Sequence, residues 1–203
     1  IELRVLAHLS DDEIMINGFN NGEDVHSITA SQVFNMPLHM VTPLMRSRAK
    51  AVNFGIVYGI GAFSLAKDIG VTRKEADAYI KGYLHHYSGI RGYLNEVVDK
   101  AREDGYCSTV FGRRRYLPNI NNRGDWGKRS FAERCSMNTP IQGSAADLLK
   151  IAMVAVHRRL EKENMKTPVP RVSSICLRER RRSVREETQL WMRLIKPLPR
   201  NIR

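Results

Sequence analysis

The sequence predicts a mainly α protein with a small β component, an α+β fold. Long stretches carry apolar residues at helical spacing, glycines punctuate these stretches, and one short segment has strand character. No internal repeat interrupts this pattern. The expected helices cover about 11–21, 24–34, 42–58, 61–69, 72–86, 88–104 and 130–164.

The first ten residues are expected to form the end of a strand that runs into a helix. Ser10, followed by Asp11 and Asp12, resembles an N-cap with an acidic first turn. Further along, four glycines stand near expected helix ends, where a left-handed residue is useful. These are Gly22, Gly59, Gly70 and Gly105.

The remaining elements follow from local signals. Thr72 and Glu75 form the pattern of a capping box. Residues 106–118 predict a short strand pair that turns at Gly112, followed by a polar loop over 119–129. The last helix begins at Ser130 and is expected to bend or break at Pro140.

Charge and composition narrow the class of protein. The 203 residues carry a net charge of +12 and allow one domain or two small ones. Such a charge favours an anionic partner, and nucleic acid or nucleotide is favoured over a membrane because no long apolar segment exists. Cys107, Cys135 and Cys176 are odd in number and far apart, which argues against a disulfide framework or a zinc site. We therefore expect a cytoplasmic protein, and the first residue, Ile1, suggests a fragment or a processed chain.

One row of side chains is the most informative feature of the sequence. Arg46, Lys50, Phe54 and Tyr58 recur every fourth residue, so each step advances roughly 40° around one helix. The two cations suit a polyphosphate and the two aromatics suit a flat base. In the alternative interpretation, the aromatics are core anchors and the cations lie on a solvated face. The row alone favours this alternative.

A second row has the same spacing. Arg134, Asn138 and Gln142 would place three hydrogen-bonding groups on one side of a helix, where they could address the minor-groove acceptors that nearly every base pair presents. A polar helix face is the alternative. Residues 113–115, all arginine, could contact backbone phosphates or form a solvated loop cluster.

Four stretches in this order resemble the family A DNA polymerases, the DNA polymerase I type. They are IELRVLAHLS, RSRAKAVNFGIVYG, GRRRYLP and RSFAERCSMNTPIQGSAADLLK. The resemblance implies a partial palm plus the helical fingers of a right-hand polymerase. It divides the chain into partial palm at 1–20, fingers at 21–129, a long helix returning to the palm at 130–165 and an atypical basic tail at 166–203.

The resemblance implies roles for the first row. Arg46 and Lys50 match phosphate ligands and are the expected catalytic residues, with Lys50 also matching the proposed proton donor to the leaving pyrophosphate. Phe54 and Tyr58 match residues beside the base and sugar of the nucleotide. The fingers helix that carries them closes over the incoming nucleotide in the family.

Other site residues are also implied by the resemblance. His26 matches a histidine that contacts the triphosphate, although alone it would be an ordinary surface histidine. Glu2 matches the carboxylate that occupies the space of a ribose 2′-hydroxyl, where a solvated terminal carboxylate is the alternative. Gly59 and Phe63 match positions near the template base.

The second row is implied to bind DNA. Arg134 and Gln142 match residues that contact the minor groove at the primer terminus, and Asn138 supports the same surface. The implied partners are primer-template DNA and deoxynucleoside triphosphates, and we expect a monomer without membrane association.

The implied activity is template-directed DNA synthesis by a DNA-directed DNA polymerase, in replication or in repair. The parent enzyme would use Mg²⁺, but neither principal metal-binding aspartate is found in this chain. One is expected ahead of Ile1. The other belongs to a His-Asp-Glu motif expected after about Asn164, and no such triplet follows His157. No metal ligand is therefore assigned, and we expect the isolated fragment to be inactive.

Two alternatives stay open for the function: a non-catalytic basic helical DNA-binding module, and a nonfunctional gene fragment. The tail after Lys166 mixes Pro, Ser and Arg without a sustained period. Out-of-frame translation or an altered end would explain it. A natural basic extension that binds nucleic acid is the competing hypothesis.

Overall fold

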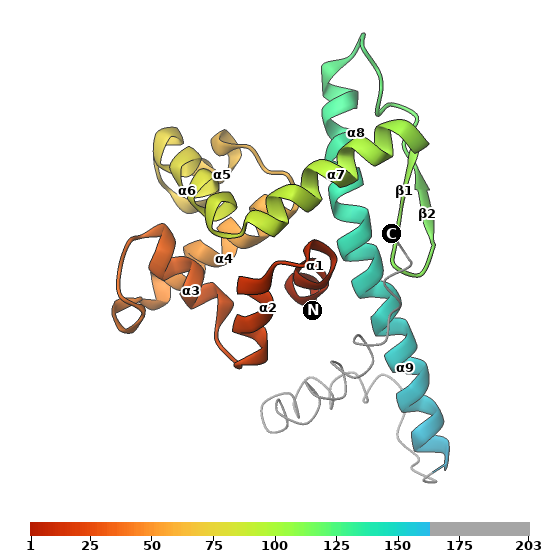
Figure 1. Cartoon of the computed structure of the whole chain (residues 1–203), viewed down its shortest axis with the longest axis horizontal. Helices are drawn as coiled ribbons and strands as arrows, with labels where there is room; N and C mark the ends of the chain where they lie inside the picture. Colours follow the sequence, from red (N-terminus) through yellow and green to blue (C-terminus); the bar gives the residue numbers. More distant parts are fainter. Residues whose placement is uncertain (163–203) are drawn as a thin grey trace. The chain divides into compact units, whose positions relative to one another are not determined.

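The computed structural model describes residues 1–162 and confirms a mainly helical fold with one small sheet (Figure 1). The chain divides into two compact units, Ile1–Ala145 and a second that begins at Ala146. The site lies in the first unit. The tail predicted at 166–203 falls outside the described residues.

The order of elements matches the predicted succession of helices and one hairpin. The elements are α1 (Glu2–Ser10), α2 (Glu13–Asn20), α3 (Val25–Val33), the 3₁₀ turn η1 (Leu38–Met40), α4 (Pro43–Val57), α5 (Ala62–Ile69), α6 (Arg73–His86), α7 (Ser88–Asp104), β1 (Tyr106–Ser108), β2 (Arg114–Tyr116), α8 (Trp126–Asn138), the π-helical turn η2 (Thr139–Gly143) and α9 (Ser144–Lys162).

The predicted local signals are found in place. Thr72 accepts from the backbone of Glu75, whose side chain in turn accepts from the backbone of Thr72, so the capping box is complete. β1 and β2 pair antiparallel with Cys107 opposite Arg115, and Gly112 has φ +79° in the turn between them. The four glycines expected at helix ends also have positive φ.

The N-terminal segment differs from the prediction. Residues 2–10 form a helix rather than the end of a strand, because Leu3, Leu6 and Ala7 follow helical spacing and bury one side. The N-cap of α2 is Asp12, which accepts from the backbone N–H of Met15 at 3.0 Å. Ser10 is instead the last residue of α1.

The last helix also begins earlier than predicted. Asp125 caps α8 by accepting from the backbone N–H of Lys128 at 3.0 Å, so Trp126 to Arg129 are helical rather than part of the loop. The predicted interruption at Pro140 is confirmed. A five-residue π-helical turn replaces the α-helix there, because proline has no N–H to donate and crowds the carbonyl one turn before it.

The main core gathers side chains from α1, α4, α5, α6 and α7. Its members include Leu6, Val52, Val57, Leu65, Tyr83, Tyr87 and Ile90. A second, smaller cluster joins the C-terminal part of α7 to the hairpin and α8, with Cys107, Leu117, Ala132 and Cys135 among its members. Both cysteines are free thiols. In Figure 1, α7 runs from the neighbourhood of α6 to that of α8 and the hairpin, and so connects the two clusters.

A buried carboxylate fastens the start of α7 to the first two helices. Asp12 is 4% exposed, and besides capping α2 it accepts from the backbone N–H of Gly89 at 3.1 Å. A Cβ at Gly89 would lie 2.9 Å from the carbonyl oxygen of Ser10, so only glycine permits this approach.

The exchange Asp12→Asn should destabilise the chain by about 1–3 kcal/mol. The amide offers only one accepting oxygen, so one of the two buried N–H donors would face an NH₂ group. Urea denaturation at neutral pH measures the loss. Asp11→Asn is the matched control, because Asp11 is exposed at φ +50°, a conformation that asparagine adopts readily. Equal effects of the two exchanges would contradict this interpretation of Asp12.

Candidate nucleotide-binding site

Helix α4 has a buried side and a more exposed side. Thr42 caps it and Pro43 stands at its first position, which the missing N–H of proline suits. Its buried side includes Val52, Ile56 and Val57. On its other side, Arg46 and Lys50 are exposed, and Phe54 and Tyr58 are half-buried. The fully buried anchors of α4 are thus the aliphatic residues, whereas Tyr58 is only partly buried where it packs against the main core.

The aromatic half of the row is a continuous surface. The rings of Phe54 and Tyr58 are stacked, with centroids 6.0 Å apart and planes inclined by 29°. The Nζ of Lys50 lies 5.9 Å from the centroid of the Phe54 ring. His26, on α3, places its ring 6.0 Å from that of Phe54. The structure therefore brings all these predicted site residues together across two helices.

The guanidinium of Arg46 forms an ion pair with a carboxylate of the same chain. Its Nε and Nη2 both donate to the carboxylate of Asp24, the latter at 3.2 Å, and the pKa of Arg46 is raised because of this hydrogen bonding. Partial burial raises the pKa of Asp24. The hydrogen bonds from Arg46 and Ser27 have the larger combined effect, so the pKa of Asp24 is lowered overall. Arginine binds phosphate in the same bidentate geometry.

Three elements meet at the hydroxyl of Tyr58. It donates to Oε2 of Glu2 on α1 at 2.7 Å and receives a hydrogen bond from the side chain of Gln142 on η2. Burial, followed by the bond to Glu2, raises the pKa of Tyr58, whereas Gln142 lowers it. Glu2 is half-buried, so it is not a freely solvated terminal carboxylate.

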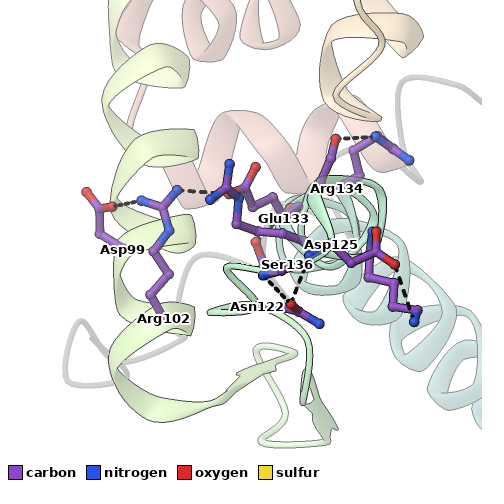
Figure 2. Close-up of polar contacts among 11 residues, drawn as sticks. Asp99, Arg102, Asn122, Asp125, Glu133, Arg134 and Ser136 are labelled. Atoms are coloured by element: carbon purple, nitrogen blue, oxygen red, sulfur yellow. Dashed lines mark hydrogen bonds and ion pairs between the residues drawn. The ribbon is translucent and has the colours of Figure 1, made fainter.

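Gly59 lets α8 approach the end of α4. Its φ is +65°, and a Cβ there would lie 2.5 Å from Cε of Met137 and 3.0 Å from Cγ of Arg134. Arg134 donates to Oγ of Ser130 at 2.7 Å, and Figure 2 shows this contact beside the ion pairs that join Arg102 to Asp99 and to Glu133. The last of these pairs links α7 to α8.

The second predicted row does not lie on one α-helix. Asn138 is the last residue of α8, and Gln142 lies within the π-helical turn, so the four-residue spacing does not describe their relation. Gln142 is directed to Tyr58 instead. Asn138 is half-buried, and its Oδ1 is buried with no hydrogen-bond partner among residues 1–162. Phe63 is 72% exposed on α5.

The three hairpin arginines make contacts within the first unit. Arg113 donates to the carbonyl of Gly143 at 3.2 Å, and Arg115 donates to Oγ1 of Thr139 at 3.4 Å. Arg114 lies over the ring of Tyr106, 4.6 Å from its centroid. Two of the three therefore hold the hairpin against η2.

Sequence reasoning missed two residues that contact the site. Asp24 occupies the N-cap of α3 directly before the Val-His pair, a position where a carboxylate was readable from the sequence as a helix cap. Asn53 is a fully buried amide whose Nδ2 lies 3.0 Å from Nδ1 of His26. A lone polar residue on the apolar side of a helix was its only signal.

No group of three or more His, Cys, Asp or Glu side chains within residues 1–162 is placed to hold a metal ion. Across the same residues, no helix has the length and apolar character needed to span a bilayer.

The mainly helical fold with one small sheet is the fold of a known class of polymerase domain. DNA polymerase family A matches residues 1–173, and the chain belongs to this family. The expected family is thereby confirmed. Family A polymerases use Mg²⁺.

The chain is similar to DNA polymerase I from several bacteria. It is 48% identical to that of Caldicellulosiruptor bescii over 169 residues, which is 83% of this chain and 20% of the relative. With DNA polymerase I of Bacillus subtilis the identity is 49% over 166 residues, covering 82% and 19%. The chain thus spans about a fifth of the length of these relatives.

A solved structure has the same fold. It is the POL domain of Pol1 from M. smegmatis in complex with DNA primer-template and dNTP, with a TM-score of 0.77 and 45% identity. The similarity covers 82% of this chain and 29% of that one.

The exchange Glu2→Gln should lower the pKa of Tyr58. A carboxylate that accepts from the phenol and repels the phenolate holds the pKa up, so its removal brings the value down. Burial remains, so the pKa should stay above its ordinary value. NMR of ¹³C-labelled tyrosine against pH measures it, with Tyr58→Phe to assign the signal. Glu13→Gln, an exposed carboxylate on α2, should leave the titration unchanged.

Proposed function

We propose that this chain forms the nucleotide-binding face of a family A polymerase that adds deoxynucleoside triphosphates to a primer 3′-hydroxyl under template direction. The observation that carries the proposal is the surface on α4. A guanidinium already engaged by a carboxylate stands one turn from Lys50, and two stacked aromatic rings follow on the same side. Family membership and the similarity to a POL domain that was solved with DNA and dNTP support it.

In this proposal each side chain has one task. Arg46 and Lys50 bind the phosphates, and Lys50 also donates the proton to the departing pyrophosphate. Phe54 and Tyr58 flank the base and sugar. The hydrogen bond to Tyr58 keeps the carboxylate of Glu2 beside the aromatic rings, which supports its role in excluding a ribose 2′-hydroxyl.

His26 is proposed to contact the triphosphate. Its ring is close to Phe54 and, through the Asp24 cap, to Arg46. A neutral imidazole can donate one hydrogen bond to a phosphate oxygen.

The DNA-binding residues are proposed to be Gly59, Phe63, Arg134, Asn138 and Gln142. The exposed ring of Phe63 supports a contact with a template base, and the close approach at Gly59 holds Arg134 beside the nucleotide site. We also propose the division into partial palm at 1–20, fingers at 21–129 and the helix from 130 to 165.

Catalysis by the isolated chain is a separate matter. The described residues offer no carboxylate cluster that fits a magnesium ion, so no step is assigned to one. We propose that the chain alone binds but does not extend a primer. Magnesium-dependent incorporation by the purified chain would contradict this.

The exchange Lys50→Ala should weaken the binding of a deoxynucleoside triphosphate about tenfold, because a charge-assisted contact to phosphate is lost. Isothermal titration calorimetry with the 203-residue chain measures the affinity. Lys100→Ala on α7 removes the same charge elsewhere and should change the affinity little. A basic DNA-binding module with no nucleotide site would instead bind DNA and show no triphosphate affinity to lose.

The exchange Asp24→Asn should strengthen triphosphate binding roughly two- to tenfold, because the phosphates no longer compete with a carboxylate for Arg46. Asparagine caps a helix as well as aspartate, so α3 should persist. Glu23→Gln is the matched control for charge. In an Arg46→Ala background the gain from Asp24→Asn should vanish, and a persistent gain would show that the competition is not for Arg46.

A further inference from the structure

We propose that Asn53 is a positioning residue that fixes His26 as the neutral tautomer with its proton on Nε2. A chain of buried hydrogen bonds carries this inference. Its functional consequence rests on the proposed contact between His26 and the triphosphate. The tautomer itself is independent of that contact.

Three of the four members of this chain of hydrogen bonds are buried, and the fourth, His26, is half-buried. Asn53 is 0% exposed, and Thr29 and Tyr87 are each 1% exposed. The hydroxyl of Thr29 donates to Oδ1 of Asn53 at 3.2 Å and lies 3.5 Å from the hydroxyl of Tyr87. At the other end, Nδ2 of Asn53 lies 3.0 Å from Nδ1 of His26.

The chemistry of an amide sets the proton on the ring. Because Thr29 occupies the oxygen of Asn53, the NH₂ group is directed at His26, and this group can only donate. Nδ1 of His26 must therefore present its lone pair. The single ring proton of the neutral form then resides on Nε2, and a proton on Nδ1 would set two donors against each other in a buried place.

Burial and most of the surrounding charges favour the neutral form of His26, and only Asp24 opposes it. Burial is the largest cause of the lowered pKa of His26. Arg46 and Lys50 on α4 and the amino group of Ile1 also lower the pKa, whereas Asp24 on α3 raises it. The ring is thus expected to be uncharged at neutral pH, with Nε2–H as its remaining donor.

This arrangement gives the proposed phosphate contact a fixed donor. A histidine in water divides its proton between two nitrogens and gains a charge near its ordinary pKa. The chain of hydrogen bonds from Thr29 through Asn53 to His26, which we call the relay, fixes the tautomer of His26. It also disfavours protonation of Nδ1, because the NH₂ group of Asn53 already donates to that nitrogen. His26 would offer one N–H to a phosphate oxygen without having to take up a proton first.

The experiment reads the tautomer of His26 by ¹⁵N NMR in the ligand-free, ¹⁵N-histidine-labelled chain, with His26→Gln to assign the signals. The wild-type protein should show a protonated Nε2 and a bare Nδ1. Thr29→Val removes the donor that orients the amide and should change the ratio of the two tautomers about tenfold toward Nδ1–H, the factor expected for one hydrogen bond. The exchange Asn53→Asp introduces a carboxylate, which can only accept a hydrogen bond. It should therefore move the ring proton of His26 to Nδ1 and raise the pKa of His26.

Ser31→Ala is the control, since it removes a hydroxyl of α3 that bonds to the carbonyl of Met36 outside the relay. A wild-type ring protonated on Nδ1 would overturn the proposal, as would a tautomer ratio unchanged by Thr29→Val. The Thr29 variant preserves the shape of the side chain, so the test does not depend on whether Asn53→Asp folds. A further outcome is that the tautomer is as expected while the His26 signals do not shift when a deoxynucleoside triphosphate is added. That result would support the relay and contradict the proposed phosphate contact.

Discussion

The burial of one side of α4 is the constraint on which the rest of the site depends. Val52, Asn53 and Val57 are each 0% exposed, so the rotation of this helix about its axis is fixed by packing rather than by the charged residues. Once the buried side is set, the helical repeat determines where Arg46, Lys50, Phe54 and Tyr58 must emerge. A change in the packing of the core that rotated α4 would therefore move all four side chains together.

Three polar groups of the candidate site are each paired with another side chain. Asp24 engages Arg46, Glu2 accepts from Tyr58, and Asn53 faces His26. These partners come from α1, α3 and α4, so the side chains are oriented by contacts between helices rather than by their own rotamer preferences. Such preorganisation lowers the entropy that a ligand has to remove. In the proposed function, a phosphate would have to replace the carboxylate of Asp24 at Arg46.

Much of this arrangement was predictable from the sequence, and the failures have physical causes. The row on α4 was predictable because it follows the periodicity of one helix. The break at Pro140 was predictable because proline has no N–H to donate. Both signals are carried by residues close together in the sequence. The N-terminal helix was missed because Leu-Arg-Val-Leu satisfies a strand and a helix pattern equally over so few residues. The relation between Asn138 and Gln142 depends on a π-helical turn that spacing cannot reveal, and the partnerships of Asp24 and Asn53 join residues far apart in the chain.

The π-helical turn has a consequence for the length of the segment that contains it. Its extra residue carries Gln142 to Tyr58 and Ser144 to the backbone N–H of Val110, which lies 2.9 Å from the serine hydroxyl. Deleting one residue between Asn138 and Ser144 would turn the side chains that follow by about 100° relative to α8. Both bonds would then be lost at once. We therefore expect this stretch to reject insertions and deletions.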